Sequence, residues 1–533
     1  PNGETLSNGR LLNDGLTVRR GRVFDRNGIV LADSVQDGDA WSRVYPEPAS
    51  AYVVGYYAPL TVGTDGLEAS WGDVLSGDET GNVFEQWLRH LLHRAREGND
   101  LRLTLDADLQ RTAQALLGER NGAAILIEVE TGRVLALASY PFYDPNLITA
   151  TTPSQAVAAE RYWQSLIEDP SKPLVQRATD GLYAPGSIFK VVTAAAAIDL
   201  GFASAGKMYE DDGTLNVEGR IIEDHNRPDE RSEWSLAESL AWSLNVVFAR
   251  VGLAVGSENL WEYASRFGFG KTIPFDVPVN RSQVASSPDF LDSLPAVADT
   301  SFGQGELLVS PLHMALLAAG IANGGTLMRP FLVEGVFGPD GERVESQEPE
   351  PWLQAVDPET AEEAEEMMVG AVEAGYASSA QLPGVRVGGK TGTAEVAGEE
   401  PHAWFIGFAG MPEPRYAVSV VLENAGAGMA GAQIIGRDLL AAALRTTSDA
   451  AASNAGLPAY VQFSQGTEAW PGATGNGRIG HDLIEQAPGS ARPPQAFRGD
   501  RARGSALTPA GGRESRSESG YRHRRRTEPA LVP

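Results

Sequence analysis

The sequence predicts an α+β fold in which a central antiparallel β-sheet is flanked by helices and carries a helical subdomain, preceded by a smaller β-rich N-terminal domain. Segments with strand composition form two groups, before and after a long stretch of helical patterns, instead of alternating regularly with helices. The chain has 533 residues, 42% of them hydrophobic, which allows a sizeable core and more than one domain. We therefore predict an N-terminal domain over residues 1–99, a larger domain over 100–446 and a disordered tail over 447–533.

The N-terminal region is polar and glycine-rich, with short strand-like pieces such as Arg22–Phe24 and Ala51–Val54. The segment from Arg20 to Gly28 joins strand residues to an Asn-Gly turn. This pattern indicates a charged β-hairpin with a salt bridge rather than an active site.

The larger domain begins with a strand, a helix and a hairpin. Leu101–Leu105 has strand composition, and Asp106 is placed to cap a helix over Leu109–Leu117. Two apolar, partly β-branched segments follow, Ala123–Val129 and Val134–Ala138, and they predict a β-hairpin.

A short stretch near the middle of the chain has the pattern of a nucleophile at a helix start. Pro185-Gly186 is a turn signal and the alanine-rich run after it ends at Gly201, so we expect a helix to begin at or next to Ser187. Residues three apart share a helix face, so the Ser187 hydroxyl and the Lys190 ammonium are expected within hydrogen-bond reach. A lysine whose pKa is lowered by burial could accept the serine proton. The alternative is chance, since Ser-x-x-Lys occurs in most long proteins.

A second polar motif, Ser243-Leu244-Asn245, interrupts the apolar helical region Leu236–Val255. Side chains two apart diverge on a regular helix, but from a loop the Ser243 hydroxyl and the Asn245 amide can both point into a cleft. Ser-x-Asn alone carries almost no information.

The strand pattern returns near the end of the domain. Val385–Thr393, Ala403–Phe408 and Tyr416–Leu422 have strand composition, between a helix at Pro311–Ala322 and a terminal helix at Ile434–Leu444. One antiparallel sheet could hold these strands together with the early hairpin.

The first of these strands contains Lys390-Thr391-Gly392-Thr393, which offers a cation, two hydroxyls and a glycine whose missing side chain would let a ligand backbone come close. The alternative is an ordinary surface strand. A Lys-Thr-Gly-Thr run is notable because lysine is rare in this chain. Lysine occurs only at Lys172, Lys190, Lys207, Lys271 and Lys390.

Composition excludes some classes of function. A formal net charge of −27 and a pI near 4.7 argue against nucleic-acid binding over most of the surface. The chain has no cysteine, so neither disulfides nor thiolate metal sites are possible. The absence of cysteine fits a cytosolic and an exported location equally well. No run of eighteen apolar residues and no signal-peptide pattern is present, and the chain starts at Pro1, so we expect a further segment upstream.

From about Thr446 the composition changes to Ala, Gly, Ser, Pro and Arg without periodicity, which is typical of a disordered tail. It ends in a basic cluster of Arg522, Arg524, Arg525 and Arg526. We interpret this as a solvated extension rather than a site for anionic lipid or acidic partners.

The chain contains three motifs in order: Ser187 with Lys190 at a helix start, Ser243 with Asn245 in a loop, and Lys390–Thr393 on a strand. With these three motifs together, the chain resembles the penicillin-reactive serine acyl-transferases. Within these it resembles the monofunctional (class B) penicillin-binding proteins, D,D-transpeptidases of peptidoglycan synthesis, over roughly residues 15–445. The fold implied is the penicillin-binding transpeptidase or serine β-lactamase-like fold on an N-terminal pedestal. Further matching segments are Arg20–Gly28, Gly122–Pro145, Tyr143–Asn146, Arg177–Lys190, Ser301–Glu306 and His402–Phe408.

The resemblance implies a role for each motif residue. Ser187 would attack the carbonyl between the terminal D-alanines of a stem peptide, with Lys190 as the base. Ser243, helped by Lys390, would pass a proton to the leaving amine, and Asn245 would hold the donor's amide. The backbone N–H groups of Ser187 and Thr393 would form the oxyanion hole, and the Thr391 and Thr393 hydroxyls, with Gly392 between them, would receive the substrate carboxylate. Neither a metal nor an organic cofactor is implied.

Other functions on this fold remain open: a β-lactamase, a D,D-carboxypeptidase, or a non-catalytic scaffold or β-lactam sensor. A bifunctional enzyme is excluded, since about one hundred N-terminal residues cannot hold a glycosyltransferase domain. The implied partners are peptidoglycan stem peptides, β-lactams, a membrane-embedded glycosyltransferase and cell-wall assembly proteins, with no nucleic acid. The implied location is the cell membrane, with the catalytic domain on the extracytoplasmic side and an anchor helix upstream of Pro1. A role in elongation or in division is not distinguished.

Overall fold

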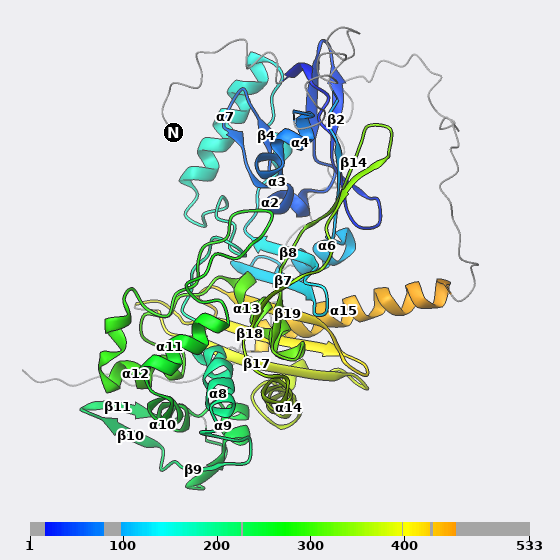
Figure 1. Ribbon diagram of the computed structural model, residues 1–533. Coiled ribbons are helices and arrows are strands. Elements are labelled where there is room, and N and C mark those ends of the chain that lie inside the picture. Colours follow the sequence, from blue (N-terminus) through cyan, green and yellow to red (C-terminus); the bar gives the residue numbers. More distant parts are fainter. Residues whose placement is uncertain (1–15, 79–96, 225–226, 397, 427–429, 455–533) are drawn as a thin grey trace, which may run out of the picture. The chain divides into compact units, whose positions relative to one another are not determined.

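The structure is a computed structural model in which residues 16–78, 97–224, 227–396, 398–426 and 430–454 are described. A five-stranded, fully antiparallel sheet with the order β17-β18-β19-β7-β8 forms its centre (Figure 1). The early hairpin and the three late strands therefore share one sheet, as the sequence predicted. The strands are β7 (Gly122–Glu128), β8 (Val134–Tyr140), β17 (Arg386–Ala394), β18 (His402–Gly410) and β19 (Pro414–Leu422).

Both faces of this sheet are buried, because helices cover each of them. Ile125 and Ile127 of β7 point into the core that includes the apolar helix α13 (Pro311–Ala322). The alternate residues Ala124 and Leu126 point into a second core formed with α6 (Ala107–Leu117) and α15 (Ala430–Asn454). Strands β7, β8, β18 and β19 are consequently near-continuous apolar runs rather than alternating ones, whereas β17 also carries Lys390 and two threonines.

The helical subdomain lies between β8 and β17 in the sequence. Its helices bear out the predicted helix after Pro185-Gly186 and the break between Leu236 and Val255. Besides α13, the helices and 3₁₀ turns between β8 and β17 are η3 (Pro145–Leu147), α7 (Pro153–Glu168), η4 (Gly186–Phe189), α8 (Lys190–Asp199), α9 (Leu236–Ala241), α10 (Asn245–Val255), α11 (Ser257–Arg266), η5 (Pro288–Asp292), α12 (Leu294–Ser301), α14 (Pro358–Ala374) and η6 (Ser378–Ala380). Of these, η3 and α7 pack against the N-terminal elements and not in the helical subdomain (Figure 1). Its short strands are β9 (Met208–Glu210), β10 (Thr214–Val217), β11 (Arg220–Glu223), β12 (Glu233–Ser235), β13 (Thr326–Met328) and β16 (Pro351–Gln354).

Two long helices were not predicted. Helix α7 lies where the sequence suggested only a loop, and its start carries a capping box between Thr152 and Gln155 with Pro153 as the first helical residue. Helix α14 also starts with a proline, Pro358. The terminal helix α15 runs to Asn454, past the expected domain end at 446. The tail prediction for residues after 454 lies outside the described residues.

The N-terminal sheet is not built from residues 1–99 alone. Its order is β15-β14-β6-β1-β2-β3, so three of its six strands come from later parts of the chain. The segment Ala51–Val54, expected as a strand, is the helix α2, which ends at Gly55 with a positive φ. The elements are β1 (Val23–Phe24), β2 (Val30–Asp37), β3 (Ala40–Val44), η2 (Pro48–Ser50), β4 (Tyr57–Ala58), β5 (Gly63–Thr64), α3 (Gly66–Ser70), α4 (Gly72–Ser76), β6 (Asp100–Leu103), β14 (Val333–Phe337) and β15 (Arg343–Ser346).

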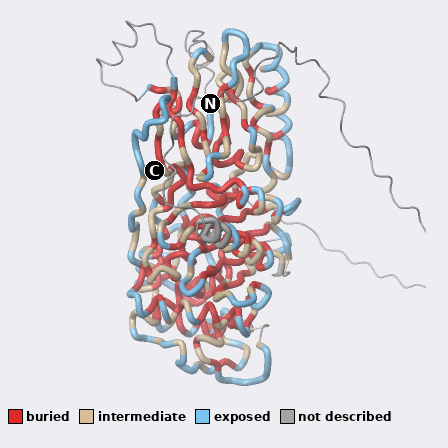
Figure 2. Tube along the Cα trace, turned by 90° about the vertical axis from the view of Figure 1, so that its right-hand side faces the viewer, coloured by how far each residue is buried: buried red, intermediate tan, exposed pale blue. Residues whose placement is uncertain are grey.

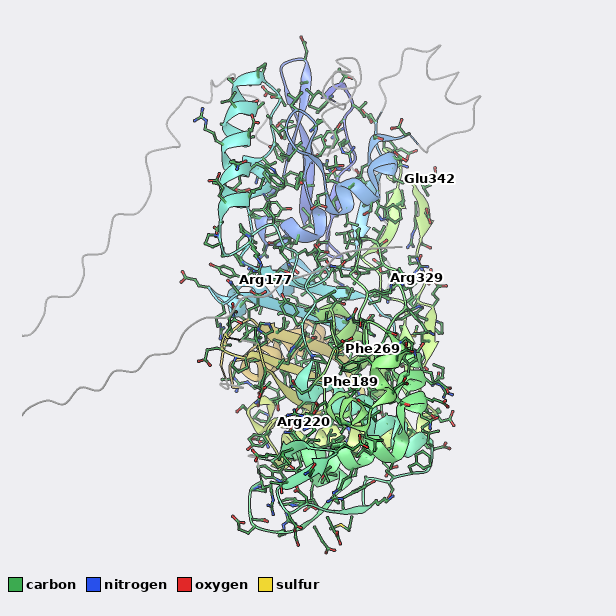
Figure 3. The ribbon with its side chains drawn as sticks, turned by 90° about the vertical axis from the view of Figure 1, so that its left-hand side faces the viewer. Arg177, Phe189, Arg220, Phe269, Arg329 and Glu342 are labelled. Atoms are coloured by element: carbon green, nitrogen blue, oxygen red, sulfur yellow. The ribbon has the colours of Figure 1, made fainter. Side chains whose placement is uncertain are left out.

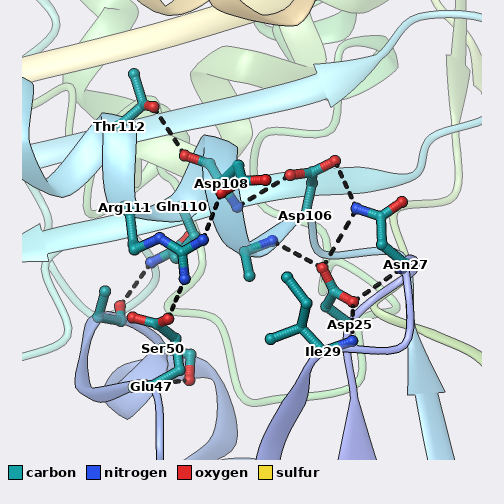
Figure 4. Close-up of polar contacts among 12 residues, drawn as sticks. Asp25, Asn27, Ile29, Glu47, Ser50, Asp106, Asp108, Gln110, Arg111 and Thr112 are labelled. Atoms are coloured by element: carbon teal, nitrogen blue, oxygen red, sulfur yellow. Dashed lines mark hydrogen bonds and ion pairs between the residues drawn. The ribbon is translucent and has the colours of Figure 1, made fainter. Parts of the chain in front are cut away.

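The predicted charged hairpin is present and joins the N-terminal sheet to helix α6. Strand β1 pairs with β2 through a turn in which the buried Asp25 accepts hydrogen bonds from the N–H groups of Asn27 and Ile29. Asp25 also accepts from the N–H of Ala107, and Asp106 accepts from the Asn27 amide (Figure 4). The turn chemistry therefore fixes where α6 starts.

Buried residues run through the interior of the described part, and exposed residues gather in the peripheral turns (Figure 2). Within the described ranges, no helix has the length and the apolar composition needed to cross a membrane.

Candidate active site

Ser187 lies in the single 3₁₀ turn η4, directly before helix α8. Its side chain is half-buried and faces a cavity, whereas residues 188–197 behind it are buried. The rings of Phe189, two residues after Ser187, and Phe269 pack edge to face with centroids 5.4 Å apart. Figure 3 labels both residues in neighbouring places. The Ser187 turn therefore rests on a buried apolar base.

Three glycines let the Ser187 turn lie directly against its neighbours. Gly186 has φ +55 and a Cβ there would lie 2.3 Å from the Thr393 carbonyl oxygen; at Gly303, φ is +93 and a Cβ would lie 1.7 Å from the Gly186 carbonyl oxygen. A Cβ at Gly392 would lie 2.8 Å from the Pro185 carbonyl oxygen. The missing side chain of Gly392 therefore makes room for the segment around Ser187, and the expected approach of a ligand backbone at Gly392 stays a prediction.

Lys190 is completely buried and joins helix α8 to the turn between α9 and α10. Its Nζ donates to the Ser243 carbonyl oxygen at 2.6 Å and to Asn245 Oδ1 at 2.8 Å, and lies 3.3 Å from Ser243 Oγ. None of the hydrogen bonds in the described part of the chain involves Ser187 Oγ, so the expected direct bond from Ser187 to Lys190 is absent. Lys190 Nζ instead donates to the Ser243–Asn245 turn, which offers the Ser243 carbonyl oxygen and Asn245 Oδ1 as acceptors.

We call Ser243–Asn245 the S-L-N turn. Ser243 has φ +60, a left-handed conformation that is rare for serine, and it breaks the helical region into α9 and α10. The break directs both polar side chains of the turn toward Lys190, and both also line the cavity in front of it, which agrees with the expected position of the two side chains at a cleft.

Lys390 completes the network from strand β17. Its buried Nζ donates to Ser243 Oγ at 2.9 Å and to the Thr391 carbonyl oxygen at 2.9 Å. Ser243 Oγ therefore receives hydrogen bonds from the Nζ atoms of Lys390 and Lys190, which leaves its own hydrogen free to point into the cavity.

Burial dominates the electrostatics of both lysines. It lowers the pKa of Lys190 to about 7, although the charge of Asp224 acts in the opposite direction. The pKa of Lys390 falls well below its usual value because of burial and, in addition, because of the nearby Lys190. Two adjacent amines in a dry site thus favour states in which one of them is neutral and able to accept a proton.

A cavity of about 440 Å³ opens in front of this network. Five of the eight predicted site residues line it, while the two lysines lie buried behind Ser243 and Gly392 lies beneath the nucleophile segment. The lining residues are Ser187, Arg220, Ile221, Ile222, Glu223, Ser243, Asn245, Phe302, Gln304, Tyr376, Thr391, Thr393 and Glu395.

Sequence reasoning missed a buried anchor for the nucleophile segment. Glu423, just after β19, accepts from the Arg177 guanidinium at 2.9 Å and from the Tyr183 hydroxyl at 2.8 Å. The Trp404 indole donates to the Ala184 carbonyl oxygen at 3.0 Å. These contacts span more than 200 residues of sequence, so no local pattern could have indicated them.

Residues 122–441 match the family described as the penicillin binding protein transpeptidase domain, which covers more than half of the chain. The chain belongs to this family. Residues 20–101 of this penicillin-binding protein match a second description, the penicillin binding protein A dimerisation domain. The transpeptidase match contains Ser187, the S-L-N turn and the Lys390–Thr393 segment.

Named relatives and solved structures of penicillin-binding proteins agree with this assignment. The peptidoglycan D,D-transpeptidase PbpA of Mycolicibacterium smegmatis is 35% identical over 473 residues, covering 83% of this chain and 92% of the relative. PbpA of Mycobacterium tuberculosis is 34% identical over 460 residues, covering 82% and 91%. The imipenem acyl-enzyme complex of penicillin-binding protein A from M. tuberculosis has a TM-score of 0.75 at 33% identity, covering 81% of this chain and all of that one. Its penicillin G acyl-enzyme complex has a TM-score of 0.73.

Proposed function

We propose that the chain is a peptidoglycan D,D-transpeptidase that cross-links stem peptides through an acyl-enzyme on Ser187, and that penicillin and other β-lactams acylate the same serine. The observation that carries this proposal is the Ser187 side chain at a cavity whose wall includes Ser243, to which the buried Lys190 and Lys390 are hydrogen-bonded from behind. Relatives named D,D-transpeptidase and neighbours solved as β-lactam acyl-enzymes support it.

In the acylation step, Ser187 Oγ attacks the carbonyl carbon between the two terminal D-alanines and its proton passes to neutral Lys190. The carbon–nitrogen bond then breaks, and Ser243 gives its proton to the leaving D-alanine amine. Lys190, 3.3 Å from Ser243 Oγ, returns the proton to Ser243, so that charge and protons balance. Without substrate, Lys190 is hydrogen-bonded to the S-L-N turn and not to Ser187. This geometry is compatible with proton transfer from Ser187 to Lys190, because catalytic hydrogen bonds tighten when substrate binds.

The remaining motif residues are assigned to binding. The N–H groups of Ser187 and Thr393 would receive the developing oxyanion, and the hydroxyls of Thr391 and Thr393 would hold the terminal carboxylate. Asn245 would orient the donor's amide. Lys390 adds positive potential behind the carboxylate site without reaching the cavity surface.

In the second step, an amine from a neighbouring stem peptide attacks the acyl carbon and Ser187 leaves with a proton, which forms the cross-link. Hydrolysis by water instead would make the protein a carboxypeptidase, or a β-lactamase when the acyl group is a β-lactam. The acceptor therefore decides between these activities.

Labelling with a fluorescent penicillin tests the proposal. We expect one stoichiometric, slowly released adduct that mass spectrometry places on Ser187, and none on Ser187→Ala with an unchanged melting temperature. Ser204→Ala, which alters an exposed serine, is the control and should label normally. Fast release would make the protein a β-lactamase, and absence of labelling would make it a non-catalytic relative.

A second assay uses a synthetic stem peptide with and without an acceptor amine. We expect D-alanine release coupled to a peptide dimer, and release without a dimer would indicate a carboxypeptidase.

We also propose the domain organisation and setting. A non-catalytic N-terminal domain would carry the transpeptidase domain on the extracytoplasmic side of the cell membrane, where its polymeric substrate lies, and a membrane-embedded glycosyltransferase would supply the glycan. Removing residues 455–533 should change neither acylation nor thermal stability. Co-purification of the membrane form with a glycosyltransferase would test the partner.

A further inference from the structure

Helix α10 starts without a cap from its own sequence. Its N-cap residue is Leu244, whose side chain cannot accept a hydrogen bond, and the preceding Ser243 has φ +60. The first N–H groups of a helix need acceptors, and a left-handed serine is strained, so the S-L-N turn needs an outside support.

Asp224, which directly follows β11, supplies that support from about twenty residues earlier in the chain. Its carboxylate accepts hydrogen bonds from the backbone N–H groups of Asn245 and Val246, the latter at 3.0 Å. The neighbouring Glu223 carbonyl oxygen accepts from the Asn245 amide at 3.2 Å. Asp224 is itself held, because its N–H donates to the Gly213 carbonyl oxygen at 3.0 Å.

The Asn245 side chain links this support to the catalytic lysine. Its amide nitrogen donates to the β11 end, while its oxygen accepts from Lys190. Asp224 therefore holds Asn245 in place. Ser243, in the same turn, contacts both Lys190 and Lys390.

Asp224 also contributes a charge to the buried network. The charged groups that act on Lys190 and its neighbours are Asp224 from the end of β11, Lys390 from β17 and, acting on Asp224 itself, Asp211. Burial raises the pKa of Asp224, and Lys190 opposes that rise. Conversely the carboxylate stabilises the ammonium form of Lys190, so removing the negative charge would lower the pKa of Lys190 further.

We propose that Asp224 is a positioning residue for acyl transfer: its carboxylate caps α10, holds the S-L-N turn against Lys190 and balances the positive charge that Lys190 carries when it is protonated. This inference rests on the proposed function, since it concerns the rate at which Ser187 is acylated.

The test compares Asp224→Asn with Asp106→Asn. Asp106 is a matched control because it also caps an eleven-residue helix through two backbone N–H groups, at the start of α6 (Figure 4). For each variant, the pre-covalent binding constant and the acylation rate constant of a slow β-lactam are measured from pH 5 to pH 9.

Asp224→Asn should lower the maximal acylation rate constant about tenfold or more. The amide oxygen can replace one carboxylate oxygen as an acceptor, but the NH₂ group would then face the second backbone N–H, donor against donor. The midpoint of the rise in rate with pH should move about half a unit or more toward lower pH. Asp106→Asn should lose a similar amount of thermal stability while both kinetic quantities stay at the wild-type values.

Asp224→Glu separates the two effects and serves if the asparagine variant does not fold. It keeps the charge but displaces the carboxylate, so we expect a reduced maximum with a midpoint near the wild-type one. An unmoved midpoint in Asp224→Asn overturns the charge role, and an unmoved maximum in both Asp224 variants overturns the positioning role. Failure of the wild type to acylate would instead count against the proposed function.

Discussion

Lys390 Nζ donates to Ser243 Oγ across 2.9 Å, and this bond ties strand β17 to the turn between α9 and α10. The two residues are 147 positions apart in sequence. Because Ser243 is held from the strand side, its proton is available only toward the cavity or toward Lys190. The position of Lys390 thus determines the direction in which Ser243 can act.

The two motif lysines should respond differently to arginine. Arginine keeps the positive charge but cannot accept a proton at working pH, so Lys190→Arg should lose essentially all acylation. Lys390→Arg should keep a measurable fraction, since the charge survives while length and geometry change. The acylation rate constant and the pre-covalent binding constant are the measurements. Complete loss in both variants would assign proton transfer or a strict geometry to Lys390, and activity in Lys190→Arg would remove Lys190 as the base.

Acylation should depend on pH through Lys190. Burial lowers the pKa of Lys190 to about 7, so the neutral form dominates above that pH and the ammonium form below it. The acylation rate constant should therefore rise through pH 7 and level off, falling about tenfold per pH unit below about pH 6. The melting temperature over the same range is the control for loss of fold. A rate that is flat between pH 5 and pH 8 would contradict neutral Lys190 as the base.

Gly303→Ala should disturb the nucleophile turn. The new Cβ would lie 1.7 Å from the Gly186 carbonyl oxygen, so the backbone beside Ser187 must shift. We expect acylation to fall at least about tenfold, since small displacements of a reacting group are costly. Gly256→Ala is the control: it has a similar φ of +82 with nothing within 4 Å of the new Cβ, so it introduces the backbone strain alone. Equal acylation in the two variants would show that the close contact does not matter.

Glu68 should stabilise the N-terminal domain without affecting acylation. Its buried carboxylate accepts from Arg20 and Arg43, and its side chain is fully buried. Glu68→Gln leaves two buried guanidinium groups without their counter-charge, so the domain should lose about 3–5 kcal/mol of stability in chemical denaturation. A loss below about 1 kcal/mol would show that the arginines find other partners.

The same carboxylate should make that domain sensitive to acid. Burial alone would raise the pKa of Glu68, but Arg43 and Arg20 outweigh it and hold the pKa below its usual value of 4.5. The stabilisation is therefore complete above the unfolded-state pKa and is lost as the pH falls through the lower folded-state value. Glu68→Gln should lack this part of the acid transition.

Local patterns indicated residues that the structure brings together, because each motif consists of a few neighbouring residues. The turn before Ser187, the break at Ser243 and the strand around Lys390 each depend on a few neighbouring residues. Asp224 could not be found this way: it reaches the S-L-N turn only through the folded β10–β11 hairpin, and nothing around it in the sequence marks it as a helix cap. The close approach of Pro185 to Gly392 was missed for the same reason, since the two residues are far apart in sequence.

The fold was predicted where periodicity and turn signals were strong, as in the hairpin of β7 and β8 and the cap at Asp106. It was missed where composition was ambiguous. Ala51–Val54 is apolar and partly β-branched, but its four residues are buried and end at a glycine with positive φ, which favours a helical turn. The capping box of α7 was a readable signal that the surrounding proline and threonine residues obscured.

The pairing of β14 with β6 has a consequence for the synthesis of the chain. The N-terminal sheet cannot be completed until Val333–Phe337 has left the ribosome, more than two hundred residues after Asp100–Leu103. At about 5–20 residues per second, the edge of β6 stays unpaired on that side for at least about ten seconds. An open strand edge of this kind is a template for pairing with other chains, so during synthesis β6 carries an aggregation hazard that the pairing with β14 removes.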